Sequence, residues 1–465
     1  MPLRFTNTLS HAKEEFRSLD PAGKLVHMYT CGPTVYRFAH VGNLRSYLAA
    51  DIARRVLEYS GYDVYHIKNI TDVGHMRDDL LDQGEDKMLM AALQEGKTPW
   101  EIADYYTQAF RKDEERLNIL PAHVFPKATD HIPEMIAITQ VLLEKGYAYE
   151  VDGTVYYDVS RFPDYGKLSG NRLDKMQAGY RVKVEQDKRA PEDFALWKKS
   201  DPGRMMKWDS PWGEGFPGWH IECSAMSMKY LGEQLDIHTG GVDNIFPHHE
   251  DEIAQSEAAT GKEFVRYWLH GEHLMVEEQK MAKSAGNFYV LQDLINAGFP
   301  PLAFRYLCLT AHYRSKLNFS WDSLTGAQTA LNRLCDYLAD WDDPGDLDEG
   351  WRRQFLDAIS DDLDSARALA VVWEMVRSDL PSSSKSALLL DFDRVLGLDL
   401  NKVERRERDL PSDVVDLINE RETARQAKDW AKSDAMRDRL REMGVEIKDT
   451  PRGPEWKIIR SGVTR

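Results

Sequence analysis

The sequence predicts an α/β protein in which a parallel sheet, interrupted by an insertion, is followed by a helical region and a small C-terminal domain. The first observation is a strand, loop, helix and strand between residues 25 and 71, the order that opens a parallel α/β sheet. The second is a change of period after about residue 290, where apolar residues recur at helical spacing in ALNRLCDYLADW and ARALAVVWEMV.

Composition sets the class of protein. The 465 residues, 42% of them hydrophobic, suffice for roughly two to four domains. Four cysteines without a CxxC pair favour a reduced intracellular protein over a disulfide framework. The N-terminus lacks the basic start and apolar run of a signal peptide, and no run of 18 apolar residues occurs, so we expect a cytoplasmic protein without a membrane partner. The net charge of −17 means that an RNA partner requires a local basic surface.

The first half of the sheet is predicted from three adjacent segments. Residues 25–31, LVHMYTC, indicate a buried strand, and residues 63–71, DVYHIKNIT, a second one. Between them, apolar residues at helical spacing indicate a helix that ends at Gly61: Leu44, Leu48, Ile52 and Val56. Ligands of such sheets bind at the carboxyl ends of the strands, so the loop at 31–43 is the expected site.

The remaining domain boundaries are predicted from changes in the residue pattern along the chain. Helical, aromatic and loop-rich stretches replace the strand pattern before it resumes with LDIHTGG and FVRYWLHGEHL, and a Pro-Ser-Ser-Ser-Lys loop at 381–385 separates helical segments. We therefore predict five parts: the first half of the sheet domain at 1–113, an insertion at 114–215, the second half of the sheet domain at 216–290, a helical region at 291–400 and a C-terminal domain at 401–465.

The C-terminal domain is less acidic than the rest of the chain, with 16 Lys or Arg against 14 Asp or Glu. Five basic residues fall at offsets that place them on one side of a helix: Arg421, Arg425, Lys428, Lys432 and Arg439. The stripe fits a surface for RNA phosphates, and it fits a solvated helix face equally well.

The segment CGPTVYRFAHVGNLRS, residues 31–46, is a candidate phosphate site. A Gly-rich turn that enters a helix presents backbone N–H groups and the positive end of the helix dipole, and His40 and Asn43 add donors. A plain turn in which His40 packs and Asn43 caps the helix explains the same residues, and short Gly motifs often occur without function.

The segment KMAKSAGN, residues 280–287, is a candidate partner for that turn. Lys280 and Lys283 precede a small, flexible run, so their ammonium groups are able to close over a triphosphate and neutralise the charge that grows as pyrophosphate leaves. Alone, the segment also fits a solvated basic loop. Together with the 31–46 segment, at the opposite end of one sheet, it indicates adenylate chemistry.

A metal site is suggested by GGVDNIFPHHEDEIAQSEA. With Pro247 at the first helical position, His248 and Glu252 lie at i and i+4, the spacing of two ligands to one ion. Cys31 and Cys223 offer two thiolates from distant points of the chain. The set suits zinc, but its scattered spacing does not define it, and an acid-rich helix N-terminus would explain the carboxylates without the His-His pair.

Taken together, these residues resemble the cysteinyl-tRNA synthetases. The resemblance rests on MYTCGPTVY, HVGN, NITDVGH, DKRAPEDFALWK, SPWGEGFPGWHIECSAM, DIHTGGVDNIFPHHEDEIAQSEA and KMAKSAGNF, and extends to the C-terminal segment. It implies a Rossmann-like class I catalytic domain, an anticodon-binding C-terminal domain, one Zn²⁺ per chain, Mg²⁺ with ATP, and a monomer whose partners are tRNA-Cys, ATP and L-cysteine. It places the zinc ligands at Cys31, Cys223, His248 and Glu252.

The resemblance also assigns the other site residues. It implies catalytic roles for His40, Lys280 and Lys283 and contact with ATP from these residues and from Gly42 and Asn43. It implies substrate contacts from Thr71, Trp219, His238 and Asp243, and the basic residues for tRNA are Arg421, Arg425, Lys428 and Lys432. Because zinc bonds a soft cysteine sulfur better than a serine hydroxyl, the roughly hundred-residue insertion is expected to carry no editing domain.

Two departures from the family pattern leave other interpretations open. Asn43 replaces the final histidine of the HIGH signature, and Ala282 removes the serine hydroxyl of KMSKS, while the main charge pattern is kept. One alternative is the related cysteine ligase of mycothiol synthesis, against which the C-terminal extension speaks. The other is a catalytically silent synthetase paralogue that binds or regulates.

Overall fold

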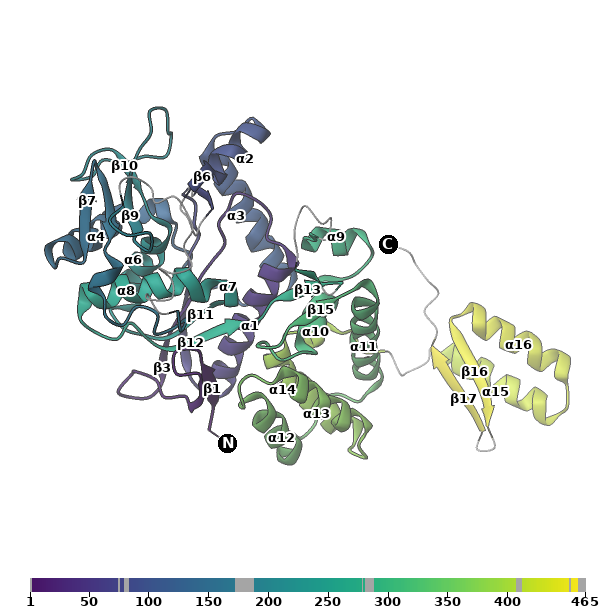
Figure 1. Ribbon diagram of the computed structural model, residues 1–465. Helices are drawn as coiled ribbons and strands as arrows, with labels where there is room; N and C mark the ends of the chain where they lie inside the picture. The colour runs from purple at the N-terminus through teal and green to yellow at the C-terminus, as the bar shows by residue number, and fades with distance from the viewer. Residues whose placement is uncertain are drawn as a thin grey trace. The chain divides into compact units, whose positions relative to one another are not determined.

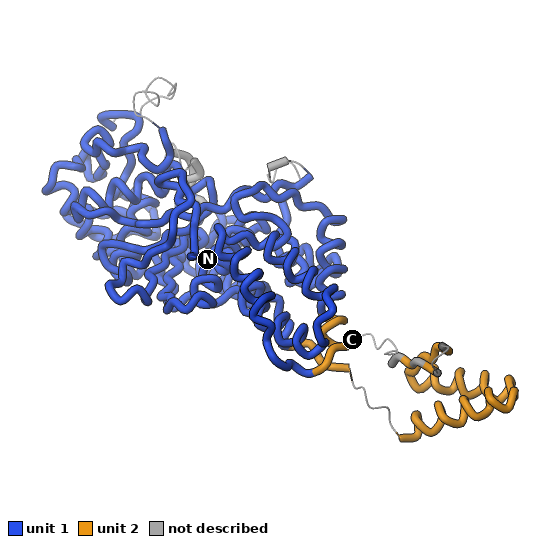
Figure 2. The backbone as a smooth tube through the Cα atoms, turned by 90° about the horizontal axis from the view of Figure 1, so that it is seen from below, with its two compact units in different colours: residues 1–334, 343–401 blue, residues 335–342, 402–465 orange. Residues whose placement is uncertain are grey.

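The chain forms two compact units in the computed structural model, residues 1–334 with 343–401 and residues 335–342 with 402–465 (Figure 2). The structure describes residues 2–73, 76–78, 83–171, 188–277, 279–280, 288–406, 412–450 and 453–458. Each unit has an apolar core of its own.

The first unit contains a four-stranded parallel sheet in the order β12-β11-β3-β4 (Figure 1). Its strands are β3 (Leu25–Thr30), β4 (Asp63–Lys68), β11 (Leu235–Gly241) and β12 (Val265–Gly271). The predicted strands at 25–31 and 63–71 and the α/β fold class are therefore confirmed. In the register His238 lies opposite Tyr29 on one side and Trp268 on the other, which brings residues far apart in sequence side by side.

Helix α1 (Val41–Tyr59) packs against β4, β11 and β12, which confirms the predicted helix. Its apolar stripe is buried, with Leu44 and Val56 at 0% exposure. The helix begins with a capping box: the Asn43 backbone N–H donates to His40 Nδ1 at 3.1 Å, and the His40 N–H donates to Asn43 Oδ1 at 3.3 Å. These two bonds satisfy orphan backbone donors and fix where the loop ends and the helix starts.

The 114–215 region contains an antiparallel sheet in the order β10-β9-β8-β7. Tyr157 and Leu196 of this sheet share one apolar core with Tyr29 and Trp268 of the parallel sheet. The compact units therefore do not separate the insertion, and its boundaries stay a prediction. The elements of this region are α4 (Ile132–Glu144), β7 (Ala148–Val151), β8 (Thr154–Tyr157), β9 (Phe194–Lys199) and, at its end, β10 (Gly215–Pro217). The helices α6 (Trp219–Leu231) and α8 (Glu250–Thr260) follow it.

Further elements complete the part of the first unit that contains the sheets. They are β1 (Arg4–Asn7), β2 (Ala12–Glu15), β5 (Met76–Asp78), β6 (Gln83–Asp86), α2 (Lys87–Glu95), α3 (Pro99–Arg116), α7 (Val242–Asn244), the π-turn η3 (Ile245–His249), β13 (Leu274–Val276), β14 (Gln279–Lys280) and β15 (Leu317–Phe319). Two short 3₁₀ turns, Ala128–His131 and Val159–Arg161, lie in the insertion.

Helices dominate after residue 290, but the region is not all-helical as the apolar spacing predicts, because β15 lies within it and pairs with β13. The helices are α9 (Leu291–Asn296), α10 (Pro301–Leu309), α11 (Trp321–Asp340), α12 (Glu349–Ile359), α13 (Ser365–Arg377) and α14 (Ser382–Leu396), with a 3₁₀ turn at Leu400–Lys402. Both α10 and α14 pack against α1. The fully buried guanidinium of Arg305 in α10 binds Asp51 of α1 at 2.6 Å and donates to the Leu396 carbonyl at 2.6 Å, which joins the helical region to the sheet.

The Asp51 ion pair predicts a pH dependence of stability. Burial alone would raise the pKa of Asp51, but Arg305 and Arg55 outweigh it and hold that pKa below its usual value. A lowered pKa in the folded state stabilises the protein above the pKa of the unfolded chain, and this contribution is lost as the pH falls through the folded value. When the pH is lowered from 6 to 3.5, the free energy of unfolding of Asp51→Asn should fall by less than that of the parent. The difference between the two decreases should be on the order of 1 kcal/mol.

Denaturant titrations across that pH range measure the difference. Asp322→Asn, a change on the first turn of α11, is the control and should follow the parent. Parallel curves for the parent and Asp51→Asn would contradict the prediction.

The second unit contains the helical hairpin α15 (Ser412–Gln426) and α16 (Trp430–Glu442), followed by the antiparallel pair β16 (Val445–Thr450) and β17 (Gly453–Ile458). The hairpin corrects the expectation of one basic stripe on one helix, because α15 ends at Gln426. Lys428 has a φ of 60°, and the Asp429 side chain caps α16 by accepting from the Lys432 N–H at 3.1 Å. Offsets of 3.6-residue period do not carry across such a turn.

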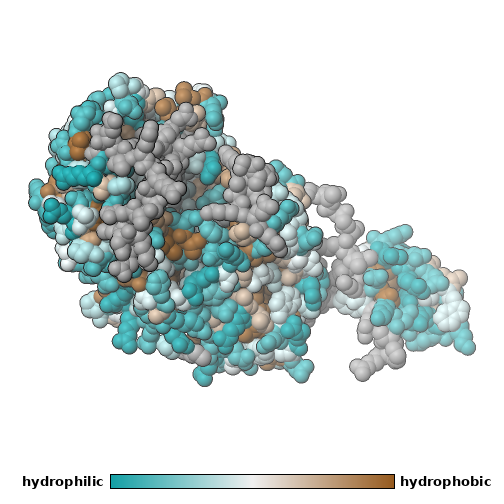
Figure 3. Space-filling model, in the orientation of Figure 1, coloured by the Kyte–Doolittle hydropathy of each residue, from teal (hydrophilic) through white to brown (hydrophobic). Residues whose placement is uncertain are grey.

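None of the helices within the described ranges is long and apolar enough to cross a membrane. The face shown in Figure 3 is mainly hydrophilic, with apolar residues scattered in small groups. The large apolar side chains lie mostly in the cores, and those most exposed are spread over several elements, among them Leu93 on α2 and Trp430 on α16.

Candidate metal and nucleotide site

A cavity of about 320 Å³ lies at the carboxyl ends of the parallel strands, where the sheet topology places a ligand. The predicted phosphate loop forms one wall and the start of α6 and the β11–α7 junction form others. The predicted site residues in its lining are Cys31, His40, Gly42, Asn43, Trp219 and Asp243.

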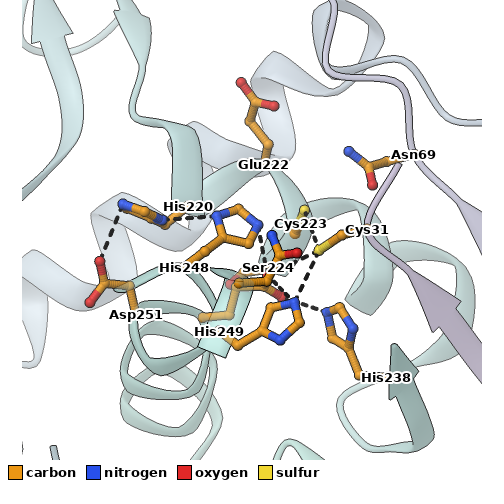
Figure 4. A network of polar contacts seen from close by, with 12 residues as sticks. Cys31, Asn69, His220, Glu222, Cys223, Ser224, His238, His248, His249 and Asp251 are labelled. Carbon is orange, nitrogen blue, oxygen red and sulfur yellow. Dashed lines mark hydrogen bonds and ion pairs between the residues drawn. The ribbon is translucent and has the colours of Figure 1, made fainter. Parts of the chain in front are cut away.

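Beside this cavity the fold brings the four predicted metal ligands together (Figure 4). Cys31 follows β3, Cys223 lies in α6, His248 in the π-turn and Glu252 in α8. Their ligand atoms all lie within 4.8 Å of one another. The two sulfurs are 3.9 Å apart, His248 Nε2 is 3.0 Å from Glu252 Oε1, and Cys31 Sγ is 3.7 Å from the same oxygen.

The donor set fits a zinc ion. Zinc bonds of about 2.0–2.3 Å in a tetrahedron place ligand atoms about 3.3–3.8 Å apart, so only small movements separate the observed distances from coordination. Two thiolates, an imidazole and a carboxylate are ligands that zinc takes in proteins. A second group, Cys31, His238, His249 and Glu252, also lies within 4.8 Å, but it contains one thiolate instead of two.

The electrostatics of the cluster favour negative charge on two of its members. A hydrogen bond from Cys31 lowers the pKa of the Cys223 thiol to about 7 against the effect of burial. Burial alone would raise the pKa of Glu252, but His238 and His248 together hold it at about 2. The cluster thus presents a carboxylate and a partly ionised thiol at neutral pH, which suits a cation.

His238, predicted to contact the substrate, lies in the layer behind these ligands. Its Nε2 is 2.9 Å from Glu252 Oε2, and its ring stacks on Trp268 with centroids 4.7 Å apart. The side chain is fully buried, and its Nδ1 has no hydrogen-bond partner among the described residues. Its position fits an orienting role for Glu252 as well as a role in the pocket wall.

Of the other predicted substrate residues, Trp219 and Asp243 line the cavity, whereas Thr71 is not part of its lining. Trp219 packs against His248, with ring centroids 4.3 Å apart and the planes tilted by 34°, and Asp243 Oδ2 lies 3.5 Å from His273 Nδ1. Thr71, in contrast, is buried, and its hydroxyl donates to Glu222 at 2.9 Å.

Some predicted ATP residues line the cavity, and others lie at or beyond the limit of the described residues. His40 uses Nδ1 to cap α1, so its Nε2 is the nitrogen left for a ligand. Burial and the charge of Arg37 lower the pKa of His40 to about 4, so the ring is neutral at pH 7 and Nε2 is able to donate. Lys280 ends β14, with its side chain beyond what the structure describes, and Lys283 lies outside the described residues.

The predicted tRNA residues differ in exposure. Arg421 is 1% exposed, and its guanidinium makes two hydrogen bonds of 2.9 Å to the Asp449 carboxylate. Arg425 Nη1 also lies 2.5 Å from Asp449 Oδ1. Lys428 is exposed in the turn between α15 and α16, and Lys432 is exposed in the first turn of α16. A phosphate contact is therefore available to the lysines, whereas Arg421 holds α15 to β16.

Sequence reasoning missed several histidines and acids around the metal cluster. His249 Nε2 is 3.2 Å from Cys31 Sγ, and its Nδ1 is 2.7 Å from His270 Nε2. On the other side, His220 lies between His248 and Asp251. The density of His and acidic residues in WHIEC and PHHEDE was the available signal, but it does not tell which of them meet.

Comparison with known proteins covers almost the whole chain. The family "tRNA synthetases class I (C) catalytic domain" matches residues 18–329, and "Cysteinyl-tRNA ligase anticodon binding domain" matches residues 407–456. Cysteine–tRNA ligase 1 of Burkholderia lata is 50% identical over 97% of this chain and 96% of its own. The cysteine–tRNA ligases of Chlorobaculum tepidum and Thermus thermophilus are 45% and 44% identical over 98% and 99% of this chain, and over 98% and 100% of their own lengths.

Solved structures show the same fold at low sequence identity. A methionyl-tRNA synthetase of Mycobacterium tuberculosis bound by methionyl-adenylate is 15% identical, with a TM-score of 0.59 over 82% of this chain and 93% of that one. A second structure of that enzyme in complex with methionyl-adenylate has a TM-score of 0.54 at 16% identity, over 81% of this chain and 90% of the other.

Proposed function

Because the chain belongs to the cysteine–tRNA ligases, class I aminoacyl-tRNA synthetases, we propose that it activates L-cysteine with ATP and transfers it to the 3′-terminal adenosine of tRNA-Cys. The observation that carries the proposal is the placement of two thiols, an imidazole and a carboxylate beside a cavity at the carboxyl ends of the parallel strands. In this position they are able to select a substrate by its sulfur while its carboxylate lies near a nucleotide.

Cysteine selection depends on the metal ligands in this proposal. Cys31, Cys223, His248 and Glu252 would hold Zn²⁺, which when bound supplies a Lewis acid with affinity for the substrate thiolate. Trp219, packed against His248, would form a wall of the same pocket. A hydroxyl is a harder and less acidic ligand than a thiol, so serine should be rejected at binding.

The nucleotide would lie over the loop at 31–43. The capping box fixes the start of α1, so the helix dipole and the neutral His40 are aimed at the phosphates without reorganisation. Gly42 and Asn43, also in the cavity lining, would complete the ATP contacts. We assign Lys280 and Lys283, the second more strongly, to the pyrophosphate as it leaves, with Mg²⁺ accompanying ATP.

The second step requires no protein nucleophile. A ribose hydroxyl of the terminal adenosine, the 2′-OH as in other class I enzymes, would attack the activated carbonyl and release AMP. The parts at 291–400 and 401–465 would contact the tRNA stem and anticodon. Contacts to phosphates position the RNA more than they select its sequence.

Cysteine-dependent ATP–pyrophosphate exchange, on protein whose metal content has been measured, tests the first step. We expect exchange with cysteine, little with serine, and one zinc per chain. Charging of tRNA-Cys then tests the second step against the cysteine ligase of mycothiol synthesis, which acts on an aminosugar-inositol. Bound zinc without exchange would favour a silent paralogue.

The tRNA surface gives a separate prediction. Reversal of charge at Lys428 and Lys432 should raise the KM for tRNA by about 10-fold, since each lost phosphate contact weakens binding regardless of sequence. Exchange without tRNA should not change, because both lysines lie in the second unit. Lys24→Glu, at an exposed position before β3 in the first unit and outside the parts assigned to tRNA, serves as the charge control. An unchanged KM for tRNA in the double variant would contradict the assignment of these lysines to tRNA phosphates.

A further inference from the structure

His248 has two ring nitrogens, and the structure gives both of them partners. Nε2 faces the metal cluster, 3.0 Å from Glu252 Oε1. Nδ1 faces away from it and lies 3.0 Å from Nδ1 of His220. The far nitrogen of His220, Nε2, lies 3.2 Å from Asp251 Oδ2. Figure 4 shows this row of two rings and a carboxylate beside the two sulfurs.

The row is closed at its outer end and shielded from water. The Tyr165 hydroxyl donates to the other oxygen of Asp251. All members of the row are buried: His248 is 2% exposed, His220 6% and Asp251 1%. In such buried surroundings a ring nitrogen without a hydrogen-bond partner would cost free energy, so the partners that the protein supplies decide where the protons lie.

The position of the protons follows from the chemistry at each end. A metal-binding nitrogen must offer a lone pair, so His248 must carry its proton on Nδ1. That N–H donates to the Nδ1 lone pair of His220, which therefore carries its proton on Nε2 and donates it to Asp251. The reverse order would place the proton of His248 on the metal-binding nitrogen, which would then have no lone pair for the ion.

We propose that His220 and Asp251 form a positioning relay that fixes the tautomer and orientation of His248 for metal binding. The inference rests on the proposed zinc site and adds two residues that do not themselves contact the ion. Hydrogen-bond partners behind a metal ligand commonly contribute roughly 10–100-fold to metal affinity. Here Asp251 acts on His248 through the ring of His220. Loss of that ring should therefore lower metal affinity as much as loss of a carboxylate bonded directly to a metal ligand.

Zinc release from the full-length, zinc-loaded protein tests the relay. With a chromogenic chelator in excess, His220→Phe should release zinc about 10–100-fold faster than the parent, because phenylalanine fills the space without an acceptor. His220→Gln should stay within about threefold of the parent, since its amide oxygen is able to accept the His248 proton. Tyr165→Phe, which removes one hydroxyl at the outer end, should give a change of about two- to threefold and leaves packing nearly intact.

A matched control separates the relay from packing. His131 is also a buried histidine with two hydrogen bonds, to the Lys127 carbonyl and to the Tyr230 hydroxyl at the opposite end of α6 from His220. His131→Phe should lower the melting temperature without changing zinc release. With cobalt in place of zinc, His220→Phe should also shift the visible absorption bands, which report ligand orientation.

Three results would overturn the relay. The first is zinc release from His220→Phe at the parent rate. The second is equal acceleration in the folded Phe and Gln variants, which would assign His220 to packing alone. If His220→Phe does not fold, zinc release from Tyr165→Phe at the parent rate, with the cobalt spectrum of the parent, would overturn it. A parent protein that binds no zinc would instead contradict the metal site of the proposed function, and the relay with it.

Discussion

Cys223→Ser is expected to remove the bound metal and to lower cysteine-dependent ATP–pyrophosphate exchange by about 100-fold or more. Serine keeps the size of the side chain but offers a hydroxyl that does not ionise at neutral pH and bonds zinc weakly. Changes to residues that only hydrogen-bond a metal ligand lower metal affinity or activity by roughly 10–100-fold. Loss of a direct ligand should therefore lower activity by at least the upper end of that range. Cysteine selection depends on the same site and should weaken in parallel.

Metal analysis and the exchange assay on the same preparation measure both effects. Cys308→Ser is the control: Cys308 lies in α10, outside both groups of candidate ligands, and burial raises its pKa to about 12. It should keep the metal and most of the exchange activity. One zinc per chain in Cys223→Ser, with exchange at the parent rate, would exclude Cys223 as a ligand.

Gly32→Ala is expected to destabilise the first unit by about 3 kcal/mol or more and to reduce exchange by about 100-fold. A Cβ on Gly32 would lie 1.6 Å from the Asn69 carbonyl oxygen and 2.7 Å from its carbon. Both are backbone atoms after β4, so neither is able to rotate away. The loop would have to move, and with it the adjacent Cys31 and the hydrogen bond of 2.7 Å from the Gly32 N–H to Asn69 Oδ1.

Denaturant unfolding and exchange together distinguish this effect from a local loss of activity. Gly326→Ala is the matched control, since Gly326 lies in α11 and a Cβ there would meet no atom within 4 Å. Alanine is the better helix former, so this control should stabilise the unit by about 0.5–1 kcal/mol. Parent-like stability and exchange in Gly32→Ala would contradict the prediction, because the loop at 31–43 would then accommodate the added Cβ without a cost.

The expectations that succeeded were those that depend on short stretches of sequence. Apolar periodicity placed β3, α1 and β4 to within a few residues, because a strand or a helix is specified by which of its own faces is buried. The i, i+4 spacing of His248 and Glu252 was kept, with Nε2 and Oε1 3.0 Å apart, although Pro247 lies inside a π-turn instead of starting a helix.

The basic stripe in the C-terminal domain failed for a physical reason. Its offsets assume one unbroken helix, whereas Lys428 turns the chain and Asp429 starts a second helix. Arg421 then faces Asp449, 28 residues further along, and is buried by that ion pair. Helical period says nothing about such a partner, because the pairing depends on where β16 packs.

By itself, the sequence determined the α/β class, the order of strands and helices, the residue types available for zinc and nucleotide chemistry, and the resemblance to the cysteinyl-tRNA synthetases. Only the tertiary structure decided which of the clustered histidines faces which sulfur and which carboxylate. Cys31 and Cys223 come within 3.9 Å because two elements 192 residues apart pack on one sheet, and His220 meets His248 for the same reason. Such contacts depend on how whole elements bury their apolar faces, and local spacing does not contain that information.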